Sequence, residues 1–157
     1  MADAAEIARV QTAGWRAGYA GLVDEEILAE LDEAERARRW ATALDDTDAL
    51  IAQDDDGVAG FVALAIPARA LDAPGVGEIT ALYVDPPRWR GGVGRALIDA
   101  AGAELRDEGC DVVVLWTFEA SERSRAFYAA LGFEPDDARK THERTGVAEV
   151  RLRARLD

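Results

Sequence analysis

Few residues in this chain could form a disulfide or bind a metal ion. Its 157 residues include one cysteine, Cys110, and one histidine, His142. A single cysteine excludes an internal disulfide framework and fits a reducing compartment, so we predict a cytoplasmic location. One cysteine and one histidine do not make the ligand cluster that holds zinc. We therefore expect no metal and interpret His142 as a residue of a sheet.

Long apolar segments are missing as well, although hydrophobic residues make up 49% of the chain. No apolar run approaches the roughly 20 residues that a membrane span requires, so we expect no membrane partner. The N-terminal segment contains no basic stretch followed by an apolar one, so we expect no secretory signal. The length fits a single domain over residues 1–157 that can bury a hydrophobic core.

Lysine is almost absent, because Lys140 is the one lysine among 18 basic residues and the rest are arginine. Acidic residues outnumber basic ones by 31 to 18, and the formal net charge is −13. This charge argues against nucleic acid or an anionic membrane surface as the main partner, and it favours a cationic ligand. An anionic ligand would need arginines at its own site to reverse the field there.

The hydrophobic pattern predicts an α/β fold with a mixed sheet. In some segments apolar residues recur at helical spacing, and in others they alternate or run continuously as in strands. Asp24 and Ser121 are suitable helix N-caps, and Gly21 and Gly132 are suitable helix ends. The predicted order is helices at about residues 5–20, 24–31 and 37–44, strands at 49–53, 58–66 and 79–84, a loop at 67–76, a helix from 93, a strand at 112–117, a helix at 121–131 and strands at 133–142 and 147–156.

The turn between the strand at 79–84 and the next helix is rich in glycine and arginine. It reads RWRGGVGR over residues 88–95. Its glycines let the backbone approach a ligand, and the helix that follows adds unpaired N–H groups and a positive dipole end. These features are typical of a phosphate-binding turn. Neither the Walker pattern GxxxxGK[ST] nor the dinucleotide pattern GxGxxG is present, which argues against an unrelated nucleotide-binding fold.

This turn resembles the acetyl-CoA loop of the GNAT N-acetyltransferases, whose pattern is [QR]xxGx[GA] after a strand. Gly92 and Gly94 match the second half, whereas Trp89 stands at the first position with an arginine on each side. Residues 121–133 resemble a second GNAT pattern, Nxx[AS]xxFYxxxGF, with Ser121 in place of the asparagine. The two motifs stand in the family's order and at about its spacing, so the chain is identified as a member of the GNAT superfamily.

The resemblance implies a mixed central sheet of about six to seven strands, flanked by helices, whose central parallel strands splay apart to bind acetyl-CoA. Backbone groups of Leu82 and Val84 would hold the pantetheine, and the Val84 N–H would polarise the thioester carbonyl. Which of the three arginines of the turn contacts the pyrophosphate is left open. The implied cofactor-binding residues are Leu82, Tyr83, Val84, Arg90, Gly91, Gly92, Val93, Gly94, Arg95, Ser121, Ser124 and Phe127.

The chemistry of acetyl transfer needs a base and an acid. An amine with a pKa of about 10.4 is almost entirely protonated at pH 7, and the ammonium form cannot attack a thioester. The resemblance implies Glu78 as the base, directly or through water, and Tyr128 as the acid that protonates the CoA thiolate. The alternatives are a solvated charge at a strand entry for Glu78 and a helix aromatic whose hydroxyl reaches solvent for Tyr128.

The resemblance further implies direct transfer to a primary amine in a ternary complex. The acceptor would be a small polar or cationic amine or a peptide amine. Trp15, Tyr19 and Trp40 are candidates for its site because the first helices flank it in the superfamily, and core packing is the alternative for all three. The C-terminal strands are a common dimer surface in the superfamily, so a homodimer is open. A CoA-binding regulatory module of the same fold, without transfer activity, is the alternative function.

Overall fold

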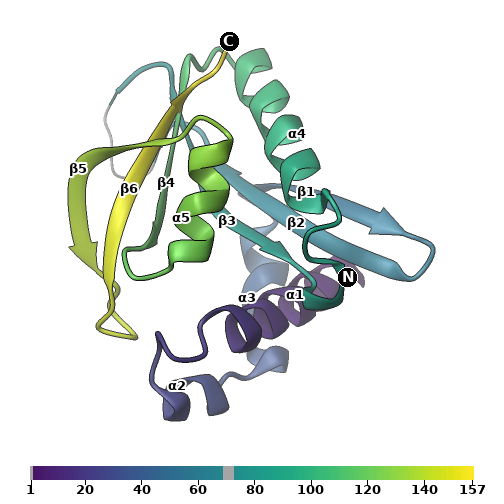
Figure 1. Ribbon diagram of the computed structural model, residues 1–157. Coiled ribbons are helices and arrows are strands. Elements are labelled where there is room, and N and C mark those ends of the chain that lie inside the picture. The colour runs from purple at the N-terminus through teal and green to yellow at the C-terminus, as the bar shows by residue number, and fades with distance from the viewer. Residues whose placement is uncertain (1, 69–72) are drawn as a thin grey trace.

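A six-stranded mixed sheet runs through the centre of the protein (Figure 1). The computed structural model describes residues 2–68 and 73–157, so part of the loop predicted at 67–76 lies outside the described residues. The strands are β1 Asp48–Asp54, β2 Gly57–Ala65, β3 Val76–Val84, β4 Val112–Phe118, β5 Glu134–Thr141 and β6 Ala148–Arg155. Their order across the sheet is β1-β2-β3-β4-β6-β5, and β3 and β4 are the parallel pair among antiparallel neighbours. The predicted α/β class and mixed sheet are confirmed.

Helices cover both faces of this sheet (Figure 1). They are α1 Ala2–Gly18, α2 Glu25–Ala29, α3 Glu33–Ala43, a 3₁₀ turn η1 Pro86–Arg88, α4 Val93–Asp107 and α5 Glu122–Ala130. Helix α1 packs on β2 and β3 with α3 beside it, whereas α4 packs on the other face of β1, β2 and β3, and α5 against β4. Asp24 caps α2 and Ser121 caps α5, as predicted. The 3₁₀ turn is an element that the sequence pattern did not predict.

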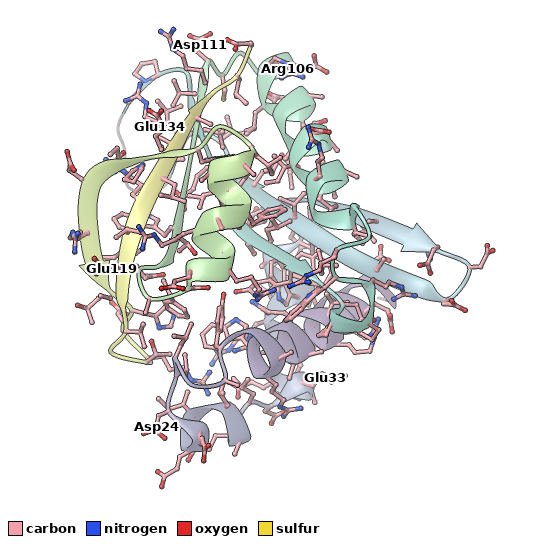
Figure 2. The ribbon with its side chains drawn as sticks, in the orientation of Figure 1. Asp24, Glu33, Arg106, Asp111, Glu119 and Glu134 are labelled. Atoms are coloured by element: carbon pink, nitrogen blue, oxygen red, sulfur yellow. The ribbon has the colours of Figure 1, made fainter. Side chains whose placement is uncertain are left out.

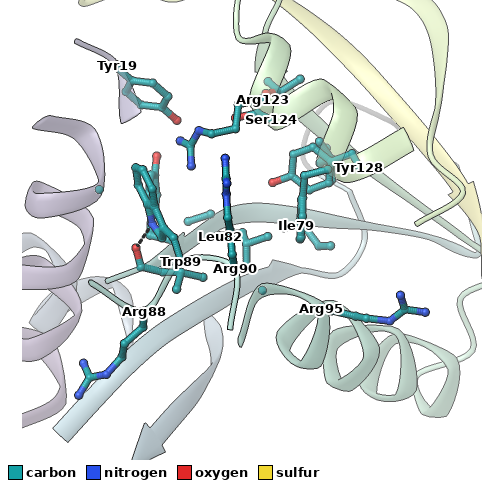
Figure 3. Close-up of a pocket in the computed structure, with 18 of the residues that line it drawn as sticks. Tyr19, Ile79, Leu82, Arg88, Trp89, Arg90, Arg95, Arg123, Ser124 and Tyr128 are labelled. Carbon is teal, nitrogen blue, oxygen red and sulfur yellow. Dashed lines mark hydrogen bonds between the residues drawn. The ribbon is translucent and has the colours of Figure 1, made fainter. Parts of the chain in front are cut away.

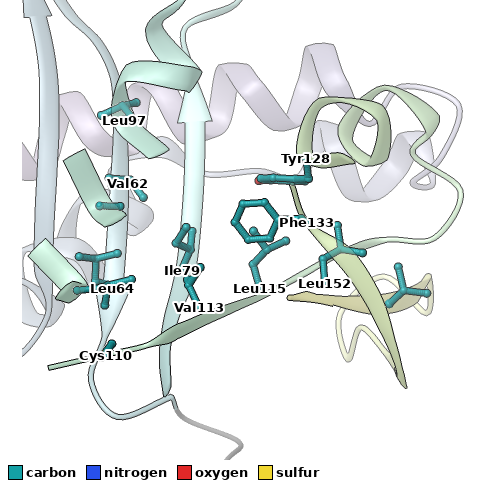
Figure 4. Packing of buried hydrophobic residues seen from close by; sticks show 13 residues of the cluster. Val62, Leu64, Ile79, Leu97, Cys110, Val113, Leu115, Tyr128, Phe133 and Leu152 are labelled. Atoms are coloured by element: carbon teal, nitrogen blue, oxygen red, sulfur yellow. The ribbon is translucent and has the colours of Figure 1, made fainter. Parts of the chain in front are cut away.

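The main hydrophobic core lies between the sheet and helices α4 and α5 (Figure 4). Helix α4 contributes Leu97, Ala101 and Leu105 from one face, as their helical spacing predicts. Tyr128 of α5 packs edge-to-face on Phe133, with ring centroids 5.6 Å apart. A second cluster on the opposite face joins α1 to the sheet through Ile7, Val10, Val58 and Phe61. Burial on both faces fixes which way each strand residue points.

The two parallel strands part halfway along their length. Residues 76–79 of β3 pair with residues 112–115 of β4, and the described pairing ends there. At the same level Ala63 of β2 pairs with Ala81 and Leu64 pairs with Ile79, so Thr80 is the extra residue of a β-bulge. A bulge bends its strand and increases the local twist. The sheet therefore opens between the C-terminal halves of β3 and β4.

Charged side chains cover the outside of the molecule (Figure 2). Strand β6 departs from simple alternation, because Val150 and Leu152 are buried as expected but Glu149 is also only 9% exposed. Its carboxylate lies 3.9 Å from the Lys140 ammonium on the neighbouring strand, which compensates its charge. Among the described helices, none combines the length and the apolar character that crossing a membrane would require.

Candidate active site

A cavity of about 530 Å³ opens where β3 and β4 part (Figure 3). Its walls come from the C-terminal halves of both strands, the 88–95 turn and one face of α5. The chain has a net charge of −13, but the described lining of this cavity is rich in basic side chains. It contains four arginines: Arg88, Arg90, Arg95 and Arg123. An anionic ligand would therefore meet a locally positive opening in an otherwise acidic protein.

The 88–95 turn needs glycine at two positions for different reasons. Gly92, the N-cap of α4, has φ of 87°, a left-handed conformation that side chains disfavour. A Cβ on Gly94 would lie 3.0 Å from the Phe127 ring, so only glycine lets α4 approach α5 this closely. No side chain caps α4. The first intrahelical bond of α4 runs from the Ala96 N–H to the Gly92 carbonyl at 3.0 Å, so the N–H groups of residues 93–95 have no partner in the helix.

The arginines of the turn do different things. Arg88 donates to the Asp85 carboxylate at 3.0 Å, to the Asp54 carboxylate at 2.8 Å and to the Val58 carbonyl at 3.1 Å, so it ties the turn to the β1–β2 hairpin. Arg90 and Arg95 line the cavity and form no ion pair with a described residue. In Figure 3, Arg90 points into the middle of the cavity, whereas Arg88 extends away from it. Arg90 and Arg95 are therefore the arginines of the turn that form no ion pair with a described carboxylate and line the cavity.

Trp89 and Arg123 form a stacked pair at the mouth of the cavity. The Trp89 indole N–H donates to the Val84 carbonyl at 2.8 Å, which fixes the ring against the end of β3. The Arg123 guanidinium lies 3.9 Å from the centre of that ring, a cation–π contact. Sequence reasoning missed Arg123. The sequence did contain one signal for it, because Arg123 lies in the first turn of the helix that carries Ser124 and Phe127.

The edge of β3 that faces the opening presents backbone N–H groups that lie beyond the described pairing with β4. The Asp85 N–H donates to the Ala59 carbonyl of β2 at 2.8 Å. Because hydrogen bonds alternate along an antiparallel strand, the N–H groups of Val84 and Leu82 point away from β2, toward the opening. The side chain of Tyr83 points instead toward α1, where its hydroxyl accepts a hydrogen bond from the Trp15 indole at 2.9 Å.

Tyr128 enters the cavity from α5 and is 9% exposed. Its ring packs edge-to-face on Phe127 and Phe133. Burial raises the pKa of the Tyr128 hydroxyl well above its ordinary value, and the nearby Tyr83 raises it further, against a smaller opposing effect of Arg123. The hydroxyl therefore stays protonated at neutral pH, which is the state that a proton donor requires.

Glu78 lies at the start of β3 and is 8% exposed. It is not among the described residues that line the cavity, although its neighbour Ile79 is. Gly77 faces Leu105 of α4, so the alternation of the strand directs Glu78 to the other face, the side of α1. The structure thus separates the predicted base from the predicted acid by the thickness of the sheet.

The residues of the second GNAT motif, 121–133, have different roles in the structure. Ser121 is buried and caps α5, accepting from the Ser124 N–H, and its hydroxyl bonds the Ser124 hydroxyl at 2.9 Å. Ser121 is not among the described residues that line the cavity, whereas Ser124, Phe127 and Tyr128 are. A short polar residue at this position therefore has a structural role, which either serine or asparagine can fill.

The three aromatic residues predicted to line the acceptor site lie at two different cavities. Tyr19 lines the cavity described above, hereafter the first cavity. Trp15 and Trp40 line a second cavity of about 720 Å³ between α1, α3 and the hairpin of β5 and β6. Both also pack in the core, Trp15 at 6% exposure and Trp40 against Phe61 with ring centroids 5.3 Å apart. These residues therefore border cavities as well as packing in the core, and their role in acceptor binding stays a prediction.

His142 and Cys110 lie apart from the first cavity. His142 follows the last residue of β5, not within the strand as predicted, and its Nδ1 accepts from the Thr145 N–H at 3.3 Å. It lines the second cavity. Cys110 is buried, and burial together with Asp111 and Glu108 raises the pKa of its thiol. A raised pKa disfavours the thiolate and any nucleophilic role at this position.

Comparisons with known proteins agree on one family. A family model described as the acetyltransferase (GNAT) family matches residues 15–133. The uncharacterized N-acetyltransferase YuaI of Bacillus subtilis is 32% identical over 155 residues, covering 98% of this chain and 85% of the relative. The mycothiol acetyltransferase of Kocuria rhizophila is 35% identical over 107 residues, covering 68% of this chain but 35% of the relative. The chain thus spans about a third of the length of that relative.

Solved structures share the fold. The PaiA N-acetyltransferase from Thermoplasma acidophilum, solved in complex with coenzyme A, matches with a TM-score of 0.74 at 20% identity, over 98% of this chain and 92% of that one. A GCN5-related N-acetyltransferase from Rhodopseudomonas palustris matches with a TM-score of 0.76 at 23% identity, over 98% and 90% of the two chains.

Proposed function

This chain belongs to the acetyltransferase (GNAT) family, and from that premise we propose that it transfers an acetyl group from acetyl-CoA to a primary amine in a ternary complex. The resemblance inferred from the two motifs is confirmed, since the family model spans both. One observation carries the proposal. The opening between β3 and β4 brings together an uncapped helix N-terminus, a glycine turn and the buried hydroxyl of Tyr128.

The first cavity has the groups that a CoA thioester needs. The N–H groups at the start of α4, together with Arg90 and Arg95, would hold the pyrophosphate. The open edge of β3 would bind the pantetheine as an added strand, through Leu82 and Val84. The Val84 N–H, aimed into the opening, would stabilise negative charge on the thioester oxygen during attack. Acetyl-CoA supplies the acetyl group, and these residues position it.

Proton transfer would involve one group on each side of the opening. Tyr128 keeps its proton because of its raised pKa and would give it to the departing thiolate. Glu78, on the side of α1, would take the proton of the incoming ammonium, directly or through water. The arrangement supports entry of the amine from the α1 side while the thioester lies on the α5 side.

A CoA-binding module without transfer activity is the second candidate. Two departures from the family patterns, Trp89 and Ser121, keep it open at the level of the sequence, although Glu78 and Tyr128 argue against it. Both residues have structural roles in the protein, because Trp89 bonds the end of β3 and Ser121 caps α5. Neither departure disturbs the glycine turn or the position of Tyr128, so the transferase is the better supported of the two.

Turnover of amines separates the two candidates. We would screen primary amines with acetyl-CoA, include the acceptor of the mycothiol acetyltransferases, and detect released thiol. We expect turnover with at least one amine and a fall of about a hundredfold or more in Tyr128→Phe, with acetyl-CoA affinity unchanged. Turnover unaffected by this variant would remove Tyr128 as the acid. Acetyl-CoA binding without turnover of any amine would favour the regulatory module.

A further inference from the structure

The second cavity adjoins the first through two contacts. Trp15 lines the second cavity, and its indole bonds the hydroxyl of Tyr83, which lines the first. Lys140 also lines the second cavity, and its ammonium lies 4.4 Å from the centre of the ring of Trp116, which lines the first. A molecule in the second cavity would therefore lie beside the end of the first at which β3 and β4 part, on the side of α1.

The charge of the second cavity is opposite to that of the whole chain. Its described lining contains four basic side chains against two acidic ones: Arg36, Arg39, Lys140 and Arg144 against Glu143 and Glu149. The aromatic part of the lining consists of Trp15, Trp40 and His142. A net charge of −13 describes the average surface, but the potential inside a cavity depends on the charges that line it.

Two of these arginines form no ion pair within the described part of the chain. Arg39 pairs with Glu35 at 2.6 Å, and Lys140 lies 3.9 Å from Glu149. Among the described residues no carboxylate forms an ion pair with Arg36 or Arg144. Their guanidinium groups are thus available to a ligand.

Arg36 is the better placed of the two. It is half-buried and lies over the ring of Trp15, 5.0 Å from its centre. Burial lowers the pKa of Arg36; Tyr83 opposes this, but the positive charges of three neighbours lower it further, namely Arg144, Arg39 and Arg16. These cations repel one another, so a bound anion would relieve the repulsion as well as form hydrogen bonds.

We propose that the second cavity selects the acceptor by a negatively charged group, so that the substrate is a primary amine that also carries a carboxylate or a phosphate. Arg36 and Arg144 would bind that group with the forked geometry that suits both oxyanions, and the indoles of Trp15 and Trp40 would pack on its carbon skeleton. The inference rests on the proposed function. It replaces the cationic acceptor that the net charge favoured, because the lining of the cavity has the opposite sign.

Matched amine pairs test the inference through turnover. One pair, β-alanine and β-alaninamide, differs by a carboxylate, and a second, phosphoethanolamine and ethanolamine, differs by a phosphate. Rates are compared per neutral amine, because the members of a pair differ in amine pKa. We expect the anionic member of at least one pair to have the higher kcat/KM, and the pair that shows it identifies the oxyanion. Equal use of both members in both pairs, or preference for the uncharged members, would overturn the inference.

Variants locate the effect. Arg36→Gln and Arg144→Gln should each lower kcat/KM for the anionic amine by about tenfold to a hundredfold and for its uncharged partner by less than about threefold. Arg38→Gln is the matched control, because Arg38 is exposed on the same helix and is not among the described residues of the cavity. Equal losses for both members of a pair would mean that the arginines serve the fold and not recognition.

A second readout does not depend on turnover. The indole N–H signals of Trp15 and Trp40 in ¹⁵N-labelled protein are followed by NMR while inorganic phosphate or succinate is added. We expect saturable shifts in the wild type and in Arg38→Gln, and their loss in Arg36→Gln. If no amine is acetylated but these shifts appear, the proposed function fails and the anion site stands. If amines are acetylated without anion preference and the indole signals do not move, the inference fails alone.

Discussion

The two cavities adjoin each other but are built from different parts of the chain. The groups proposed to bind the ligand in the first come largely from the backbone of residues 80–95, namely an open strand edge, a glycine turn and the start of a helix, while β4, α5 and Tyr19 complete its walls. The second is made of long side chains from α1, α3 and the β5–β6 hairpin. Backbone geometry is set by local residues that tolerate little change. Side-chain charges can be altered one at a time, so under the proposed roles acceptor preference can vary while the cofactor site is kept.

Glu78→Gln is expected to have the largest effect among the changes that probe this difference. Glu78 lies on the α1 side of β3, where the acceptor would enter, and glutamine keeps its size but cannot take a proton. We expect turnover to fall by about a hundredfold near neutral pH and partly recover at high pH, where more of the amine is neutral. Steady-state rates across pH measure this. A uniform loss at every pH would assign Glu78 a structural role.

Arg88 and Arg95 belong to the same turn and should respond differently. Arg88 is held by Asp85, Asp54 and Val58, and its side chain is 19% exposed. Arg88→Gln should therefore lower the free energy of unfolding by about 1–3 kcal/mol, measured by urea denaturation. Arg95 forms no ion pair with a described residue, so Arg95→Gln should weaken acetyl-CoA binding without loss of stability. The reverse pattern would contradict the roles given to the two arginines.

Ser121→Ala should have the smallest effect. It removes the cap of α5, and we expect a loss of about 1 kcal/mol in the free energy of unfolding, with turnover changed less than severalfold. Ser124→Ala is the control, because Ser124 lines the first cavity while Ser121 does not. A large loss of acetyl-CoA affinity in Ser121→Ala, with stability intact, would show that Ser121 contacts the cofactor after all.

The sequence predicted the first cavity better than the second for a physical reason. Glycine suits position 92 because φ is positive there, and position 94 because α4 and α5 lie close together. The local geometry is therefore visible in the sequence as a glycine motif. The helix caps Asp24 and Ser121 are likewise local, and both predictions are confirmed.

Features that depend on distant segments could not be read from a pattern. Arg123 matters because α5 carries it over Trp89, and neither residue predicts the other. The second cavity combines Arg36 and Arg144, which lie on segments that only the folded sheet brings together. The net charge favours a cationic acceptor, but a sum over the chain contains no information on which charges line a cavity.

Calorimetry of the Gly92→Asp variant is the measurement that decides whether the 88–95 turn binds acetyl-CoA. Gly132→Asp is a matched control, since Gly132 has φ of 91° and, like Gly92 at 87°, no atom within 4 Å of an added Cβ, so the backbone strain is similar. We expect micromolar binding by the wild type and by Gly132→Asp, and its loss in Gly92→Asp, where a carboxylate would face the pyrophosphate. Equal binding by both variants, or none by folded wild type, would mean that this turn is not the acetyl-CoA site.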